Sequence, residues 1–291
     1  MRLTLAIPIM NQLDDCKAAL ASFKYMSSRD VTWLVIDNGS TDPVEAFIRK
    51  YIKPYRLNYI RNEENIGMVK TLQQIYENCQ TDVLAITHND VFIYEPQWDK
   101  LVTKVFKDDD KVGAAGFFGA QGCGPIGERI QDTPPGYAAG MSNMLEAELH
   151  GMRMNDFVHP AAIFDGFMMI FRKSMLDKVN GFDQNYQYHH LYDRDASLTS
   201  LALGYHNVTL GIPSHHLSGL TANRTEYQTW IDKQVKTKDF KGDSWTHEKN
   251  TEIFRDKWKD YLPVYVENDF SYRTQPSGTW EFKGDKICSQ S

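Results

Sequence analysis

The feature that most constrains the fold is a regular alternation of apolar and amphipathic segments over the first 117 residues. Five short apolar segments have the length of buried strands; they are Leu3–Ile9, Val31–Ile36, Leu57–Ile60, Val83–Thr87 and Val112–Phe117. Each of the first four is followed by a segment whose apolar residues recur at helical spacing. Strands that alternate with helices in this way predict a mostly parallel sheet covered by helices on both faces.

A glycine-rich stretch interrupts this pattern. From Phe118 to about Asn143 glycine and proline are frequent, so we expect a long, partly mobile loop without regular structure. The run from Gly119 to Gly127 would be either a lid or a phosphate cradle, and we favour the lid because the run does not lie between a strand and a helix. Regular structure should then resume in four segments, a strand at Ile163–Phe171, helices at Lys173–Val179 and Asp193–Leu203, and a strand at Tyr205–Leu210.

The last 70 or so residues differ in composition from the rest. From about Thr221 the chain is charged and tryptophan-rich, and it has helical stretches near 225–238 and 247–260. We therefore expect a main domain over 1–220, with a nucleotide-binding half at 1–117 and an acceptor half at 118–220, and a helical appendage over 221–291. The aromatic side chains of the tail either close the core of this appendage or form a surface on which sugars or bases stack.

Composition argues against several classes of protein, although a local basic patch remains possible. The net charge of −6 argues against sequence-independent binding to nucleic-acid phosphates, which requires an excess of Lys and Arg. The four cysteines lack C-x-x-C spacing, so they indicate neither a structural zinc site nor a disulfide framework, and we expect Cys16 and Cys79 to fill the core. No apolar run approaches the roughly 18 residues of a membrane helix, and the start lacks a signal-peptide pattern, so we expect a soluble, cytoplasmic protein.

Polar side chains follow three of the predicted strands. Met10-Asn11, Asp37-Asn38 and His88-Asn89-Asp90 come directly after the first, second and fourth apolar segments. In open parallel sheets the carboxyl ends of the strands form the ligand-binding edge, so we expect these clusters to converge. The first turn lacks the G-x-G-x-x-G pattern and the chain lacks a P-loop, which argues against a nicotinamide cofactor and against P-loop nucleotide binding.

These clusters belong to a longer ordered series. The series consists of Ile7–Asn11, Val35–Asp42, Asn65–Gly67, Thr87–Val91, Asp165–Phe167, Gly181–Asp183, Tyr192–Asp195 and His215–His216. In order and spacing it resembles the family 2 glycosyltransferases of the GT-A fold, from Leu3 to about Asn223. The resemblance implies a Rossmann-like α/β sheet sandwiched by helices, and an inverting transferase that uses a nucleotide sugar.

The resemblance also implies a set of donor-binding residues. Pro8 and Met10 would border the nucleoside, and Asp37 and Asn38 would meet the nucleobase and ribose. The remaining members of the predicted donor site are Asn11, Asn65, Gly67, His88 and Asn89.

The resemblance further implies that Asp90 holds a divalent cation, Mn²⁺ or Mg²⁺. That role is chemically sensible, because such an ion neutralises the donor diphosphate and clamps the leaving group. A histidine would complete the metal shell, and we prefer His216 to His215. Asp90 as an ordinary turn residue and the histidines as hydrogen-bonded loop residues are the alternatives.

Three carboxylates are candidates for work on the acceptor. The resemblance points to Asp193 as the general base that takes the proton of the attacking hydroxyl, with Asp195 as a competitor. A helix cap is the alternative for Asp193. Asp165 would orient the sugar or the acceptor, and its alternative is a buried, hydrogen-bonded carboxylate.

The sequence also departs from the family pattern. His88 stands where many relatives carry the first Asp of D-x-D, and Asn38 stands where some carry an acidic residue. Tyr192 replaces a frequent Glu, and Met10 replaces a frequent aromatic residue. The Q-x-x-R-W pattern of processive relatives is absent, which favours transfer of a single sugar.

We therefore expect a hexosyl- or pentosyltransferase that uses a UDP-sugar and a glycan, a protein or a hydroxylated DNA base as acceptor. A catalytically inactive glycan-binding or scaffolding relative is the alternative, followed by a nucleotidyltransferase.

Overall fold

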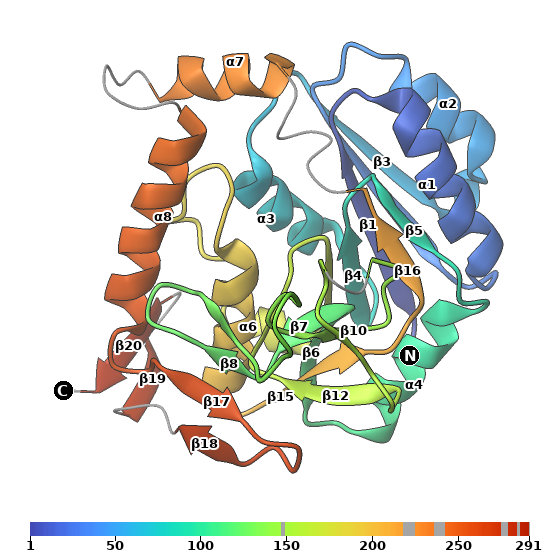
Figure 1. The fold of residues 1–291 in the computed structure, drawn as a ribbon. Helices are drawn as coiled ribbons and strands as arrows, with labels where there is room; N and C mark the ends of the chain where they lie inside the picture. Colours follow the sequence, from blue (N-terminus) through green and yellow to red (C-terminus); the bar gives the residue numbers. More distant parts are fainter. Residues whose placement is uncertain (147–148, 218–224, 236–241, 275–278, 284–285, 291) are drawn as a thin grey trace.

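The structure is a computed structural model of the 291-residue chain. It describes all residues except 147–148, 218–224, 236–241, 275–278, 284–285 and 291 (Figure 1). Among the helices of the described residues, none has both the length and the apolar character that crossing a membrane requires.

A mostly parallel sheet of eight strands forms the centre of the molecule, as the sequence predicted. The five expected strands are β1 (Leu3–Ile9), β2 (Thr32–Asn38), β3 (Leu57–Asn62), β4 (Val83–Thr87) and β6 (Val112–Gly116). The other three are β12 (Val158–Ala161), β14 (Met168–Arg172) and β15 (His206–Leu210). The order is β12-β15-β6-β14-β4-β1-β2-β3, in which β14 and β12 run antiparallel to their neighbours.

Helices cover both faces of this sheet. One face carries α1 (Leu13–Met26), α2 (Val44–Tyr51) and α4 (Trp98–Asp108), and the other carries α3 (Met68–Asn78), α5 (Lys173–Asp177) and α6 (Tyr192–Ala202). Alternate side chains of β1 supply both layers, since Leu5 and Ile7 pack under α1 whereas Ala6 packs under α3. Cys16 and Cys79 are buried in these two layers, as expected. The α/β class with helices on both faces is confirmed.

The glycine-rich stretch contains short strands, so the prediction of an irregular loop is wrong there. The strands are β7 (Phe118–Ala120), β8 (Gly122–Cys123), β9 (Arg129–Ile130) and β10 (Met141–Ser142). A Cβ atom on Gly119 would lie 2.3 Å from the Thr209 hydroxyl, and one on Gly122 would lie 2.7 Å from the Tyr265 ring. The glycines therefore permit close packing between strands, which explains the run better than a lid or a phosphate cradle.

The strand predicted at Ile163–Phe171 is two strands in different sheets. The chain leaves β13 (Ile163–Phe164), which pairs with β7, and enters β14 in the central sheet. Asp165 lies in the turn between them. A pair of short strands, β5 (Val91–Ile93) and β16 (Ser214–His216), forms a separate ribbon beside the end of β4. Another short strand, β11 (Met152–Arg153), pairs with β10.

The tail contains the two helices that the sequence indicated, α7 (Thr225–Gln234) and α8 (Gly242–Trp258). Residues 236–238 of the first predicted helix lie outside the described residues. The tail also contributes strands that were not predicted, β17 (Val264–Val266), β18 (Tyr272–Thr274), β19 (Thr279–Lys283) and β20 (Lys286–Gln290).

Strand β17 pairs with β8 of the preceding part, and helix α8 lies beside α6 (Figure 1). Trp258 of α8 is fully buried in the same hydrophobic cluster as Leu198 and Leu201 of α6. The domain boundary near residue 220 stays a prediction.

Candidate active site

A cavity of about 230 Å³ lies at the carboxyl ends of β1, β2 and β4. On the sheet side it is lined by Pro8, Ile9, Met10, Asn38, Asn65, Gly67, Met68, His88, Asn89 and Asp90. The opposite side consists of Tyr188, His189 and Tyr192 from the segment that leads into α6, Tyr227 and Trp230 from α7, and His216 from β16. The predicted convergence at this edge of the sheet is therefore observed, and the tail supplies part of the wall.

A cluster of three potential metal ligands lies in this cavity. Strand β16 pairs antiparallel with β5 in a register that sets His216 opposite Val91, and this places its Nε2 3.3 Å from Asp90 Oδ1. The ring of His216 stacks on Phe167 at 4.8 Å, which fixes its direction. One ligand atom from each of His88, Asp90 and His216 lies within 4.8 Å of the others.

The electrostatics of the cluster suit a cation. Burial would raise the pKa of Asp90, but the hydrogen-bonding contact with His216 outweighs burial and lowers it. Burial and the neighbouring His216 lower the pKa of His88. An ionised Asp90 carboxylate and a neutral His88 imidazole are the protonation states that bind a metal. Two nitrogens and one carboxylate fit Mn²⁺ better than Mg²⁺, which prefers a shell of oxygens.

His215 faces away from this cluster. Neighbouring residues of a strand point to opposite sides, and His215 Nδ1 lies 2.9 Å from Glu146 Oε1 while its ring contacts Phe92. The structure thus brings His216, and not His215, to Asp90.

A network of amides forms the sheet side of the cavity. Asn38 Nδ2 donates to Asn65 Oδ1 over 2.8 Å, and Asn65 Nδ2 lies 2.9 Å from the sulfur of Met10. The backbone N–H of Gly67 donates to the same Asn65 oxygen. Gly67 has φ +82°, and a Cβ there would lie 3.2 Å from the backbone of Tyr188, so glycine is required where the two walls of the cavity meet.

Two predicted donor-site residues instead support the turn after β2. Asp37 is fully buried and accepts hydrogen bonds from Tyr59 Oη (2.6 Å) and Ser40 N (2.8 Å), and it is ion-paired with Arg61. The side-chain oxygen of Asn11 accepts a hydrogen bond from the backbone N–H of Thr41 over 2.7 Å. Neither side chain is among those that line the cavity.

Asp193 is held by an arginine that the sequence analysis did not consider. It lies in the first turn of α6, next to the cavity-lining Tyr192, and it is buried. Arg194 Nη1 lies 3.0 and 2.9 Å from its two oxygens, and Arg194 Nε donates to the Gly127 carbonyl over 2.8 Å. The N-cap of the helix is Leu191, which makes no side-chain cap hydrogen bond, so Asp193 lies in the first turn beyond the cap position. The adjacent position of Arg194 in the sequence is the signal that could have suggested the pair.

A second arginine holds Asp165. Arg129 of β9 is ion-paired with its carboxylate and lies over the Phe118 ring at 4.5 Å. Burial would raise the pKa of Asp165, but Arg129 and Arg194 outweigh burial and lower it to about 2. Arg129 is 36 residues away in the sequence, and nothing in the local pattern signals this contact.

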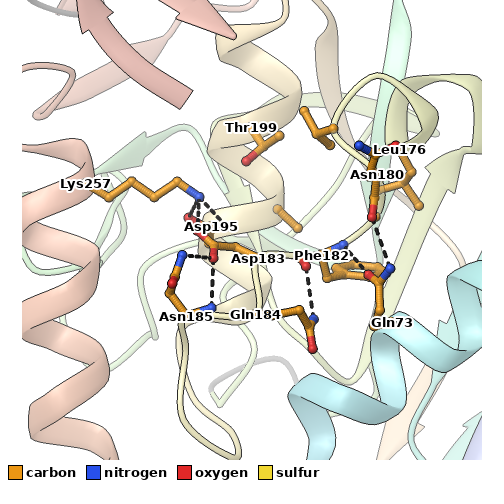
Figure 2. A pocket seen from close by; sticks show the side chains of 13 residues that line it. Gln73, Leu176, Asn180, Phe182, Asp183, Gln184, Asn185, Asp195, Thr199 and Lys257 are labelled. Atoms are coloured by element: carbon orange, nitrogen blue, oxygen red, sulfur yellow. Dashed lines mark hydrogen bonds and ion pairs between the residues drawn. The ribbon is translucent and has the colours of Figure 1, made fainter. Parts of the chain in front are cut away.

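The side chain of Asp195 contacts helix α8 and does not line the cavity that holds Asp90. Its carboxylate accepts from Tyr186 Oη (2.9 Å) and Trp258 Nε1 (2.8 Å), and it lies 2.7 Å from Lys257 Nζ. Figure 2 shows Lys257 reaching from α8 to Asp195 and Asp183 in a second cavity, of about 280 Å³. The structure therefore does not bring Asp195 to the cavity that holds Asp90, and its contacts join α6 to α8.

The chain was compared with known families and structures. The model of a family described as glycosyl transferase family 2 matches residues 4–179, more than half of the chain. No curated protein matches the chain.

Among solved structures, the chain is similar to a mannosyltransferase, PcManGT from Pyrobaculum calidifontis, in complex with GDP-Man and Mn²⁺. The TM-score is 0.53 at 16% identity, over 87% of this chain and 69% of that one. GalNAc-T7 with UDP, GalNAc and Mn²⁺ gives a TM-score of 0.66 at 13% identity, over 90% of this chain and half of that one. TarS (1–349) from S. aureus with UDP-GlcNAc gives 0.54 at 12% identity, over 89% and 72%. These likenesses show a shared fold.

Proposed function

Because the chain belongs to glycosyl transferase family 2, and is thus a glycosyltransferase, we propose that it transfers a single sugar from a UDP-sugar to an acceptor hydroxyl. The transfer would invert the anomeric carbon and depend on Mn²⁺. The observation that carries the proposal is the cluster of His88, Asp90 and His216 inside a cavity whose other wall is aromatic. Two structural neighbours hold UDP or UDP-GlcNAc, which supports the choice of donor, and two hold Mn²⁺, which supports the choice of metal, although one of the Mn²⁺ structures holds GDP-Man. The cytoplasmic location stays a prediction.

The donor diphosphate would lie beside Asp90, with the nucleoside toward Pro8, Met10 and Asn38. Mn²⁺ bound there would neutralise charge that develops on the departing diphosphate. Asn38 and Asn65 are tied to each other, so their amides are fixed before the donor arrives. A fixed set of polar groups lowers the cost of ordering the site on binding.

Asp193 would act as the base. Its carboxylate would accept the proton of the acceptor hydroxyl as that oxygen attacks the anomeric carbon, on the side opposite the nucleotide, which produces inversion. Arg194 contacts both oxygens and fixes the orientation of the carboxylate. The acceptor would approach from the side of Tyr188 and Trp230, whose rings meet edge to face at 5.4 Å. Rings exposed to a cavity can stack on sugars or bases, which supports the second interpretation of the aromatic tail for Trp230.

Asp165 would serve the acceptor side through Arg129. The ion pair keeps the carboxylate charged and in one position, so that it can receive a hydrogen bond from a sugar or acceptor hydroxyl. A glycan, a protein and a hydroxylated DNA base remain the proposed acceptor classes.

The test is release of UDP from UDP-sugars, with and without Mn²⁺, by wild type and by Asp90→Asn. Loss of several kcal/mol of metal-assisted stabilisation would lower the rate by roughly a thousandfold. Asp110→Asn, at an exposed position, is the matched control and should keep the wild-type rate.

If the wild-type protein turns over no common nucleotide sugar, the enzymatic proposal is overturned. An inactive glycan-binding relative is then favoured. An Asp90→Asn variant with unchanged metal dependence would overturn the metal assignment. Incubating a radiolabelled donor with glycan, protein and modified-DNA pools would identify the acceptor class, and NMR of the product would report the anomeric configuration.

A further inference from the structure

A second group of potential metal ligands lies on the tail side of the cavity. His189 Nε2 and His190 Nε2 lie 2.8 and 3.1 Å from the same oxygen, Asp243 Oδ1. The two imidazole rings are 3.7 Å apart, centroid to centroid. Ligand atoms of all three residues lie within 4.8 Å of one another. The mechanism proposed above uses none of these contacts.

The backbone that carries the two histidines is fixed to helix α8. Asn250 of this helix is fully buried, and its Nδ2 donates to the carbonyls of His189 and His190, the latter over 3.1 Å. Its Oδ1 accepts from the backbone N–H of Gln187 over 2.7 Å. Asp243 belongs to the same helix. All three ligands are therefore positioned by one rigid element, as a metal site requires.

A fourth ligand is within reach. His247 follows Asp243 by four residues on α8, so both side chains lie on the same face of the helix. Its ring meets the His190 ring edge to face at 5.2 Å, and its side chain is exposed.

We propose that His189, His190, Asp243 and His247 form a second metal site, for a borderline transition-metal ion such as Zn²⁺. Three imidazole nitrogens and one carboxylate oxygen make a four-coordinate N/O set of the kind that Zn²⁺ prefers and that Mg²⁺ and Ca²⁺ do not. This set contains no sulfur, so the spacing of the cysteines in the sequence gives no signal of it.

The site would be structural. It joins the segment before α6 to the first two turns of α8, and His189 itself lines the active-site cavity. The backbone around it is unusual, since His190 and Leu191 have φ of 73° and 62° although neither is glycine. Such conformations persist only where the surroundings hold them in place. A bound ion would hold this wall of the cavity against the tail.

The experiment uses the full chain, stripped of metal and free of nucleotide. Zn²⁺ binding is measured by equilibrium dialysis, and Co²⁺ is used as a spectroscopic probe, because four-coordinate Co²⁺ absorbs intensely in the visible range. Wild type should show the Co²⁺ absorption and bind one Zn²⁺ that is retained in Asp90→Asn. At Zn²⁺ about 100-fold above Kd, its Tm should rise by roughly 5–10 °C.

The variants separate this site from the one at Asp90. Asp243→Asn should weaken Zn²⁺ binding by roughly 100-fold or more and abolish the Co²⁺ absorption, because it removes a direct ligand. His247→Ala, at an exposed position, should fold normally and weaken binding at least roughly tenfold. Asp256→Asn, which makes the same chemical change at an exposed position of α8, and Asp90→Asn should both keep the site.

The proposal is overturned if wild type binds no Zn²⁺ under these conditions. It is also overturned if Asp90→Asn removes the ion while Asp243→Asn retains it, or if His247→Ala leaves the affinity unchanged. Because no nucleotide sugar is present, these outcomes are independent of whether the chain proves to transfer UDP-linked sugars.

Discussion

Asp193 and Asp195 lie two residues apart in α6, and the structure predicts that replacing them has opposite consequences. Asp195→Asn should destabilise the protein and leave the transfer rate of the folded enzyme unchanged. Asp193→Asn should lower that rate by roughly 10²–10⁴-fold, the usual contribution of a general base.

The size of the Asp195 effect follows from its contacts. Tyr186, Trp258 and Lys257 all approach Asp195 Oδ1, at 2.9, 2.8 and 2.7 Å, and Lys257 also approaches Oδ2 at 3.0 Å. The amide of Asn at this position would still accept hydrogen bonds from Tyr186 and Trp258, but each bond would stabilise the fold by about 1 kcal/mol less. The amide would also turn an N–H group toward the ammonium group of Lys257. Lys257 keeps Asp183 at 2.7 Å, so the loss stays below that of an unpaired buried charge. We therefore expect Asp195→Asn to lower the free energy of unfolding by about 3 kcal/mol and the Tm by about 6–12 °C.

The assay combines urea unfolding with initial rates at a temperature where both variants are folded. Rates are expressed per folded molecule, so that a loss of stability is not mistaken for a loss of chemistry. An Asp195→Asn variant of wild-type stability that transfers sugar a hundredfold more slowly would refute the reasoning and make Asp195 the base. Full activity in Asp193→Asn would refute the assignment of Asp193.

Three further outcomes follow from the structure. His216→Ala should raise the Mn²⁺ concentration for half-maximal rate by at least roughly tenfold, measured by titrating Mn²⁺ at saturating donor. The pKa of Asp165 is lowered from 3.8 to about 2, so its pair with Arg129 stabilises the fold fully above about pH 4 and is lost as pH falls toward 2; Asp165→Asn should flatten this acid dependence in urea unfolding. Gly122→Ala should cost about 1–3 kcal/mol in the same assay, because its methyl group would stand 2.7 Å from the Tyr265 ring, and a loss under about 0.5 kcal/mol would show that the strands can separate freely.

Local pattern was enough to predict the central sheet. Apolar runs of five to seven residues became β1, β2 and β4 with ends within a residue or two of those expected, because both faces of these strands are covered and their composition is uniformly apolar. The same regularity predicted that the segments after these strands meet at one edge. His88, Asn38 and Met10 do line one cavity there.

Features that depend on distant pairing were not predictable in this way. The glycines at 119 and 122 suggest a loop in isolation, and they become strand residues because Thr209 and Tyr265 pack against them. Asp165 forms an ion pair with Arg129 of the β8–β9 hairpin, and no local sequence pattern predicts this pair. His190 meets Asp243 across 53 residues, and neither lies in a recognisable ligand spacing.

The composition of the Asp90 cluster determines how the metal and the donor depend on each other. One carboxylate supplies a single negative charge, and the position that is acidic in many relatives is the imidazole of His88. Imidazoles supply nitrogen ligands without charge, so the protein alone neutralises only half of a divalent cation. The donor diphosphate would supply the remaining negative charge and several oxygen ligands. The electrostatic stabilisation is therefore greatest when the protein and the donor bind the same ion. If Asp90 binds the metal as proposed, we expect binding of metal and of nucleotide sugar to be reciprocally coupled, each strengthening the other by the same factor.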